Sequence, residues 1–137
     1  MQAVPANIES VVQSVQDAAR AIHTNLGPHM TEMVYESCLC QELTERKLSV
    51  VRLKSLPFFY KDVRLDDVNL RSLMFVQDSV LLEVSNFESG SIDQILADMA
   101  YCHKTVGLVV NLSRAEFSDV VRRYNSSDVI EPAQVRH

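Results

Sequence analysis

The chain has 137 residues, of which 47% are hydrophobic and 23% are charged. This length and apolar content predict one globular domain that can bury a core of its own. The formal net charge of -5 argues against a nonspecific nucleic-acid-binding protein, because neutralising backbone phosphates requires clustered Lys and Arg side chains.

The cysteines and the apolar runs indicate the cellular setting. Cys38, Cys40 and Cys102 are an odd number with no paired framework, which is typical of a reducing compartment. Together with His103 they lack the ligand spacing of structural zinc, so buried thiols are expected. The longest apolar runs, such as 107–110, are of strand length. We therefore expect an intracellular protein with no membrane-spanning segment.

Two helices are predicted at the N-terminal end. Apolar residues recur every three or four positions over residues 8–26, with Asn7 as a cap and Gly27 and Pro28 at the end. A second helix is expected over about 30–47, with Thr31 as its cap. Its buried stripe is predicted from the same periodicity and consists of Val34, Tyr35, Cys38, Leu39 and Leu43.

Short β segments follow the helices. Residues 49–53, 57–61 and 63–65 are rich in β-branched and aromatic side chains, and a tight turn is expected at Lys61 and Asp62. Strands over 71–76 and 79–87 are predicted next, joined by a turn at 77–79.

The C-terminal part is predicted to contain a helix, a buried strand and a last helix. Ser91 is expected to cap a helix from Ile92 to about His103, and residues 106–112 form an apolar strand. Ser113 is expected to cap a helix from Arg114 to about Tyr124. We predict one domain over residues 1–124 and a polar tail over 125–137.

On the strand 79–87, one acidic side chain stands among apolar and small ones. Leu81, Glu83 and Ser85 share a face because strand side chains alternate, and Glu83 is the only acid there. One carboxylate alone makes a poor magnesium site, because hydrolytic metal sites use about two carboxylates and usually a nearby lysine.

Five blocks stand in a characteristic order, and their order and spacing carry a family resemblance. They are Leu26–Glu36, Phe58–Lys61, Val80–Ser85, Gln94–Leu96 and Gly107–Asn111. The chain resembles, over residues 8 to about 124, the GxxExxY family of small proteins related to PD-(D/E)XK nucleases. The resemblance implies an α/β (α+β) nuclease-like fold with a central mixed sheet of four or five strands flanked by helices.

The resemblance also implies that catalytic groups are missing. The family's metal-binding aspartate falls on Leu73, ten residues before Glu83, and its catalytic lysine falls on Ser85. The first glycine of the namesake motif falls on His29, whereas Glu32 remains.

The chain can also be compared with the family at the end of the namesake motif and in the helix that begins near Gln94. Tyr35 of the namesake motif remains, and we expect it in the core. Gln94 matches the glutamine that opens the family's helix, and Asp98 stands where an aromatic residue is usual.

We therefore expect a catalytically inactive domain that acts as a structural or protein-interaction subunit, with a protein partner or a second copy of itself. No catalytic residue and no cofactor is predicted, and the relic positions are Glu32, Leu73, Glu83, Ser85 and Gln94. If a metal were bound, Glu83 and Glu32 would hold it. Glu83 is expected to pair with a base such as Arg71 or Lys54, because an unpaired buried carboxylate is costly.

The alternative is a Mg²⁺-dependent nuclease or a nucleic-acid-binding protein with a rebuilt site. Asp66 or Asp67 could then join Glu32 and Glu83, although adjacent residues on an extended chain point to opposite faces. The missing lysine would be replaced by one of three candidates that the spacing does not separate, namely Lys54, Lys61 and Lys104. His23 and His29 are expected to be surface or packing residues.

Overall fold

A five-stranded mixed sheet in the order β1-β4-β5-β6-β7 organises the fold. The computed structural model describes residues 7–86 and 92–127. The sheet consists of β1 (Val50–Ser55), β4 (Leu70–Val76), β5 (Val80–Val84), β6 (Val106–Val110) and β7 (Val121–Asn125). Only β5 and β6 pair in parallel among these neighbours, and the other three pairs are antiparallel. The predicted mixed sheet is confirmed, and β5 and β6 are two of its inner strands.

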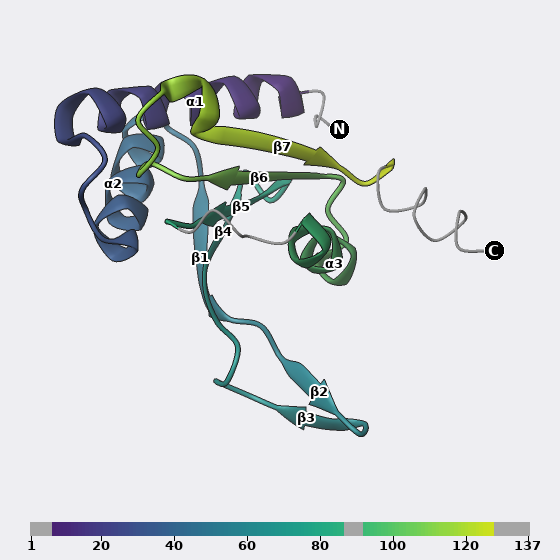
Figure 1. Cartoon of the computed structure of the whole chain (residues 1–137). Helices are drawn as coiled ribbons and strands as arrows, with labels where there is room; N and C mark the ends of the chain where they lie inside the picture. The colour runs from purple at the N-terminus through teal and green to yellow at the C-terminus, as the bar shows by residue number, and fades with distance from the viewer. Residues whose placement is uncertain (1–6, 87–91, 128–137) are drawn as a thin grey trace.

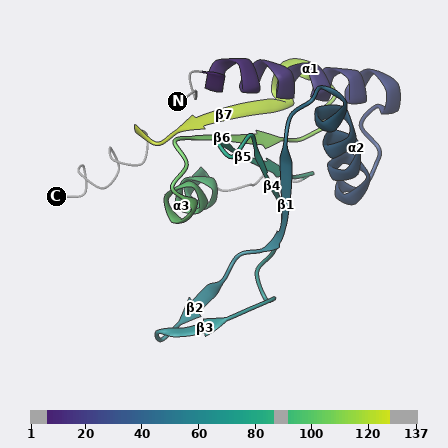
Figure 2. The same ribbon diagram turned by 180° about the vertical axis from the view of Figure 1, so that it is seen from behind.

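Helices cover both faces of the sheet, so the domain has three layers (Figure 1). α1 (Ile8–Leu26) and α2 (Glu32–Glu45) lie on one face, and α3 (Ile92–Cys102) lies on the other. The view from behind shows the same layering (Figure 2). Because β5 and β6 are parallel, the chain must cross over between them, and α3 lies within that crossover.

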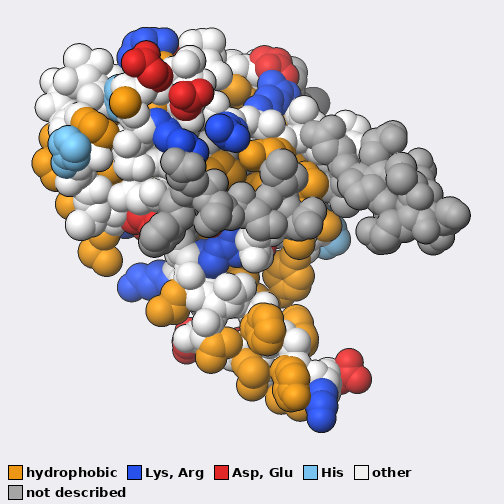
Figure 3. Space-filling view, viewed as in Figure 1, with side chains coloured by type: hydrophobic (Ala, Val, Ile, Leu, Met, Phe, Trp, Pro, Cys, Tyr) orange, Lys and Arg blue, Asp and Glu red, His pale blue; other side chains and the backbone are white. Residues whose placement is uncertain are grey.

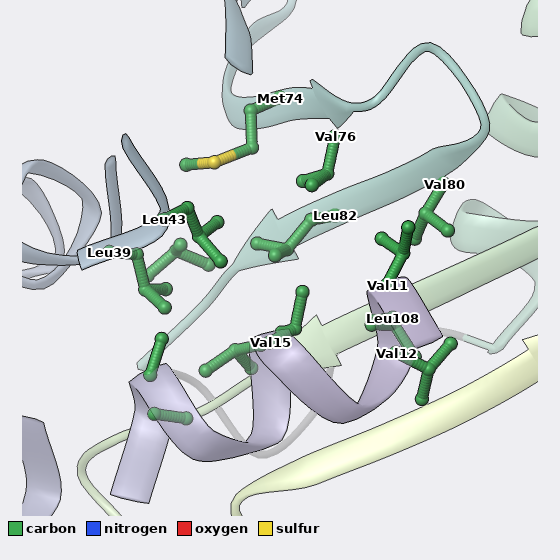
Figure 4. Packing of buried hydrophobic residues seen from close by; sticks show 14 of the residues in the cluster. Val11, Val12, Val15, Leu39, Leu43, Met74, Val76, Val80, Leu82 and Leu108 are labelled. Atoms are coloured by element: carbon green, nitrogen blue, oxygen red, sulfur yellow. The ribbon is translucent and has the colours of Figure 1, made fainter. Parts of the chain in front are cut away.

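The core follows this division into two faces. Val11, Val12 and Val15 of α1 point toward Leu82 and Leu108 of the sheet (Figure 4). On the opposite face, a smaller cluster joins α3 to the sheet and consists of Leu56, Leu73, Leu81, Ile95, Leu96 and Met99. Gly107 lies under α3, where an added Cβ would come within 2.6 Å of the Met99 sulfur. The missing side chain at Gly107 therefore allows α3 to pack close to β6.

The connection between α1 and α2 is held by backbone and side-chain bonds. Gly27 ends α1 with a φ of 72°, a conformation that favours glycine. Asn7 stands at the N-cap position of α1, but its side chain makes no capping bond. The Thr31 side chain caps α2 by accepting a hydrogen bond from the Val34 N–H, as predicted. Val34 itself is 39% exposed, so its place in the buried stripe was wrong.

The predicted last helix over 114–124 was also wrong. The chain forms a short 3-10 turn at Phe117–Asp119 and then the strand β7, which pairs antiparallel with β6. The apolar spacing of Phe117, Val120 and Val121 fits a helix locally, but β7 satisfies the otherwise open edge of β6. Ser113 caps no helix and instead donates hydrogen bonds to Asn111 Oδ1.

Other boundaries differ by a few residues. The strand predicted to reach Leu112 ends at Val110, and Asn125, assigned to the tail from the sequence, ends β7. The strand predicted to reach Phe87 ends at Val84, because the described residues Ser85 and Asn86 are not part of it. The expected cap Ser91 and most of the expected tail lie outside the described residues.

A two-stranded arm projects from the sheet (Figure 1). It is formed by β2 (Phe58–Tyr60) and β3 (Val63–Leu65), which pair antiparallel. Lys61 and Asp62 form its two-residue turn, as predicted, and both have positive φ, as a type I′ hairpin turn requires.

Tyr35 gives a test of the α1–α2 connection. Its side chain is fully buried, its hydroxyl donates a hydrogen bond to the Gly27 carbonyl, and it accepts one from the Met30 N–H at 3.1 Å. Tyr35→Phe leaves both groups without this partner and is expected to lower the free energy of unfolding by about 1–3 kcal/mol. Urea denaturation measures the change. Tyr101→Phe, at a half-exposed position, is the matched control and should change stability by less than about 0.5 kcal/mol.

Candidate functional site

One guanidinium lies between two carboxylates where β4, β5 and α3 meet. The Arg71 Nη2 atom is 2.8 Å from Glu83 Oε2 and 2.6 Å from Asp98 Oδ2. The Arg71, Glu83 and Asp98 side chains are 9%, 19% and 6% exposed, respectively. We call these three residues the ion cluster. Glu83 thus pairs with Arg71, one of the two bases expected from the sequence.

The local path of β4 contributes to this geometry. Leu53 of β1 pairs with Leu73, whereas Ser55 pairs with Leu70, so β4 contains one extra residue across this interval. Such a bulge bends the strand and re-aims its side chains. The extra residue falls at Arg71 and Ser72, immediately beside the ion cluster.

Polar groups surround the ends of β5 and β6. The Asn86 N–H donates a hydrogen bond to Glu32 Oε2 at 2.9 Å, and the Asn86 side chain donates to the Met30 carbonyl at 2.9 Å. These bonds join the first turn of α2 to the end of β5. Glu32 is therefore a half-buried hydrogen-bond acceptor rather than a solvated first-turn anion.

The buried polar residues of the described part of the chain gather in the same region. They are Ser85, Asp98 and Asn111. Ser85 follows β5 and its N–H donates to the Val110 carbonyl at 3.0 Å, and Asn111 follows β6. Gln94 is exposed on α3, where its amide donates to Asp98 Oδ1 at 3.3 Å. Because burying polar groups is costly, their concentration here sets this end of the sheet apart.

The position across from Glu83 is apolar. Leu73 is the Cα partner of Glu83 in the β4–β5 ladder, and its side chain is completely buried. It packs in the cluster beneath α3 that also contains Leu81 and Met99. The side chain across the ladder from Glu83 is therefore part of the apolar core and offers no ligand to an ion.

Burial sets the protonation behaviour of Glu83. Desolvation raises the pKa of its carboxyl above the ordinary value, and the hydrogen bond from Arg71 opposes this without cancelling it. One guanidinium is shared between two carboxylates, and the charges of Asp98 and Glu32 raise the Glu83 pKa further. The Arg71 pKa is raised because its bonds to Asp98 and Glu83 outweigh its burial.

A polar groove of about 710 Å³ runs between α2 and the region where the end of β1 pairs with the start of β4. Its lining consists of Glu32, Met33, Glu36, Ser37, Arg52, Lys54, Leu70, Arg71 and Ser72. Arg52 is paired with Glu36 at 2.8 Å, and Lys54 has no charged partner within residues 7–86 and 92–127. The groove thus contains charges of both signs.

The other residues that the sequence suggested for a rebuilt site lie apart from the ion cluster, and they interact with other groups. Asp66 pairs with Arg64 on the connection after β3, and Lys61 lies at the tip of the arm. Lys104 donates to the carbonyl and the carboxylate of Asp78.

The histidines and cysteines also have simple structural environments. His23 hydrogen-bonds to the Arg114 carbonyl at 2.7 Å, and His29 is exposed. The three cysteines are half-buried with free thiols, so their predicted burial was only partly right. Within the described ranges, no three His, Cys, Asp or Glu side chains are grouped so that they could hold a metal ion.

Asp98 is the member of the ion cluster that sequence reasoning did not connect to Arg71. The signal was present, because Asp98 stands at a position where an aromatic side chain is usual in the resembled family, on the buried side of a helix. A charge in that place requires a partner of opposite sign, and Arg71 is that partner.

This chain belongs to the PD-(D/E)XK nuclease superfamily. The model of that superfamily matches residues 9–124, which is most of the chain and leaves out only the first residue of α1 and the last residue of β7 among the elements described above. Neither a curated protein nor a solved structure matches the chain significantly. In the part of the chain that the structure describes, no helix has the length and apolar character needed to cross a membrane.

The superfamily implies a divalent metal ion, and the residues around Glu83 do not fit one. The side chain opposite Glu83 is the buried Leu73, and a guanidinium already contacts the Glu83 carboxylate. A hard cation requires several oxygen ligands, and a leucine supplies none.

Removing the shared guanidinium should be strongly destabilising. Arg71→Met leaves Glu83 and Asp98 buried without a counter-ion, and it is expected to lower the free energy of unfolding by about 3–5 kcal/mol. The triple change Arg71→Met, Glu83→Gln and Asp98→Leu removes all three charges and should recover most of that loss. Urea denaturation of both variants checks this, and equal stability of the two would contradict the assigned role of charge.

Glu83 should also make stability depend on pH. Its pKa is raised in the folded protein, so the unfolded chain loses this proton near the ordinary value of 4.5 before the folded chain does. The contribution of Glu83 to the free energy of unfolding is therefore largest below pH 4.5 and falls as pH rises through the folded pKa. Relative to Glu83→Gln, the wild type should lose stability as pH rises from about 4.5 through the folded pKa of Glu83, as urea denaturation at a series of pH values measures. Glu116→Gln, at an exposed position, is the control.

Proposed function

We propose that this chain is a catalytically inactive, GxxExxY-type member of the superfamily that acts as a structural or protein-interaction subunit. The observation that carries the proposal is the buried Leu73 directly across the ladder from Glu83. On the family resemblance, Leu73 stands at the position of the metal-binding aspartate, and Ser85 stands at that of the lysine.

The chemistry of phosphodiester hydrolysis supports the proposal. Hydrolysis at a metal centre needs carboxylates that hold the ion and a group that polarises water or phosphate. Here Glu83 is bound by Arg71, and Ser85 is buried, with no charge to contribute. The ion cluster supplies its own cation from the protein, so its carboxylates act as partners of Arg71.

The exposed apolar surface supports a role in contacts between proteins. The arm and its base expose Phe58, Phe59, Tyr60, Val63, Leu65, Val68 and Leu70. Figure 3 shows hydrophobic side chains gathered on the projecting arm. A concentration of exposed apolar side chains of this kind is typical of a site that contacts another protein.

We further propose an intracellular, reducing location. The support is the odd number of cysteines and the free thiols of all three.

A second candidate is a nuclease or nucleic-acid-binding protein with a rebuilt site. The groove favours it, because Lys54 and Glu32 both line that space beside the ion cluster. The formal net charge of -5 counts against it.

Restoring the family's charges tests the proposal. In the variant Leu73→Asp with Ser85→Lys, both new charges enter buried positions, so we expect a loss of several kcal/mol in stability. Thermal unfolding is measured with and without Mg²⁺, and cleavage of DNA and RNA is assayed for wild type and variant at millimolar Mg²⁺ or Mn²⁺. We expect no cleavage by the wild type and no gain in stability from the metal.

A control pair carries the same two types of substitution at a Cα pair of β1 and β4, in which Leu70 is exposed and Ser55 is half-buried. Leu70→Asp with Ser55→Lys changes the Cα partners at the start of β4, where Leu70 is 71% exposed. The free energy of unfolding of this control should remain within about 1 kcal/mol of the wild-type value. Two results would refute the inactive, closed site. One is metal-dependent cleavage by the wild type that Glu83→Gln abolishes, and the other is an unchanged melting temperature of the variant Leu73→Asp with Ser85→Lys.

A further inference from the structure

The two carboxylates of the ion cluster approach the guanidinium through a single atom. Glu83 Oε2 lies 2.8 Å and Asp98 Oδ2 lies 2.6 Å from Arg71 Nη2. Arg71 Nε also donates to Glu83 Oε2, at 3.3 Å, so one carboxylate oxygen accepts both bonds. A guanidinium is frequently bound to a carboxylate by two parallel bonds to its two oxygens. The oxygens of the ion cluster instead converge on one point.

This convergence leaves hydrogen-bonding groups of the ion cluster unused. Among the described residues, the buried atoms Arg71 Nη1 and Asp98 Oδ2 have no hydrogen-bond partner. The Asp98 side chain is 6% exposed, and its Oδ2 lies against the guanidinium as an ion pair without a directed bond. Buried polar atoms without hydrogen bonds are costly. The arrangement therefore suits a directional donor poorly.

A metal ion of the right size suits these oxygens better, because its bonds to oxygen require no directed N–H group. Ca²⁺ binds carboxylate oxygens at about 2.3–2.6 Å in a flexible geometry and completes its shell with carbonyl groups and waters. The distances of 2.6 Å and 2.8 Å at Arg71 Nη2 lie at or just above the upper end of that range. Mg²⁺ requires about 2.0–2.1 Å and a near-octahedral shell, and fits less well.

The charges of the ion cluster favour a cation of higher charge. Glu83 and Asp98 carry two formal negative charges, and Arg71 is the one base that pairs with them in the part of the chain that the structure describes. The charge of Glu32 acts on Glu83 as well. Lys54 lines the neighbouring groove, but no ion pair joins it to either carboxylate within the described ranges. One guanidinium therefore balances these carboxylates only in part.

We propose that the Arg71 guanidinium takes the place of a hard divalent cation, of the size of Ca²⁺, between Glu83 and Asp98. Asp98 of α3 supplies a second carboxylate, which Leu73 of β4 does not. The two carboxylates still require a cation, and in the wild type the guanidinium meets that requirement and excludes the ion. This inference rests on the inactive site proposed above and identifies the group that keeps a metal out of it.

Removing the guanidinium tests the proposal. Arg71→Ala keeps both carboxylates and leaves room for an ion and its waters. We expect Ca²⁺ to bind this variant with a dissociation constant of about 0.1–1 mM, measured by calorimetric titration. At 10 mM, Ca²⁺ should raise the melting temperature of the variant by roughly 5 °C or more, and that of the wild type by less than about 1 °C. KCl at the same ionic strength controls for screening.

Two further variants are matched controls. Arg71→Ala combined with Glu83→Gln and Asp98→Asn keeps the shape of the site and removes both negative charges, so its affinity for Ca²⁺ should fall at least about tenfold. Arg52→Ala removes a guanidinium that pairs with the single carboxylate of Glu36 at 2.8 Å. The melting temperature of this second control should respond to Ca²⁺ no more than that of the wild type.

Another substitution covers the case in which Arg71→Ala does not fold. Arg71→Gln leaves an amide that can donate to one carboxylate and present an oxygen to the ion. It should show the same rise in melting temperature with Ca²⁺. If neither variant folds in 10 mM Ca²⁺, the ion does not replace the guanidinium and the proposal is overturned.

The results that overturn this proposal are distinct from those that overturn the lack of catalysis. A folded Arg71→Ala variant that does not respond to Ca²⁺, an equal response of the triple variant, or a wild type that binds Ca²⁺ as tightly as Arg71→Ala overturns the stand-in role of the guanidinium. Cleavage of nucleic acid by the wild type refutes the inactive site, whatever the Ca²⁺ titration gives. Binding of Ca²⁺ to Arg71→Ala alone, with no cleavage by the wild type, supports both.

Discussion

One positive charge shared by two buried carboxylates determines how this end of the domain is built. Arg71 comes from β4, Glu83 from β5 and Asp98 from α3, so the cluster joins three elements of the fold. Burying any one of these charges alone would cost several kcal/mol, and only their mutual contact makes the arrangement tolerable. The position of α3 on the sheet is thus fixed by electrostatics at one point and by apolar packing over Leu73 and Leu81 beside it.

The same end of the sheet is held by hydrogen bonds that do not depend on catalysis. The polar ring of Glu32, Asn86 and Asn111 closes backbone and side-chain hydrogen bonds where β5 and β6 end. These bonds stabilise the fold whether or not a reaction takes place nearby. A carboxylate such as Glu32 can therefore persist as a structural acceptor after a catalytic role is gone, which we propose for this chain.

Much of the fold could be predicted from the sequence, and the failures have physical causes. The helices and inner strands were predictable because their apolar periodicity extends over whole elements, as in Ile8–Leu26. β7 was not, because Phe117, Val120 and Val121 fit a helical spacing and only the unsatisfied edge of β6 decides for a strand. The pairing of Glu83 with a base was predictable from the cost of a buried charge. The third member of the ion cluster was not, because the distance between Asp98 and Arg71 depends on how α3 packs over Gly107.

The bulge in β4 has a mechanical consequence. The strand that carries Arg71 continues directly into the chain that returns from the arm, and the extra residue between Leu70 and Leu73 lies at the junction. A bulge bends the strand and re-aims its side chains, so the extra residue helps set the direction in which the chain leaves the sheet toward the arm. The direction of the arm and the position of the buried Arg71 guanidinium therefore depend on the same short stretch of β4.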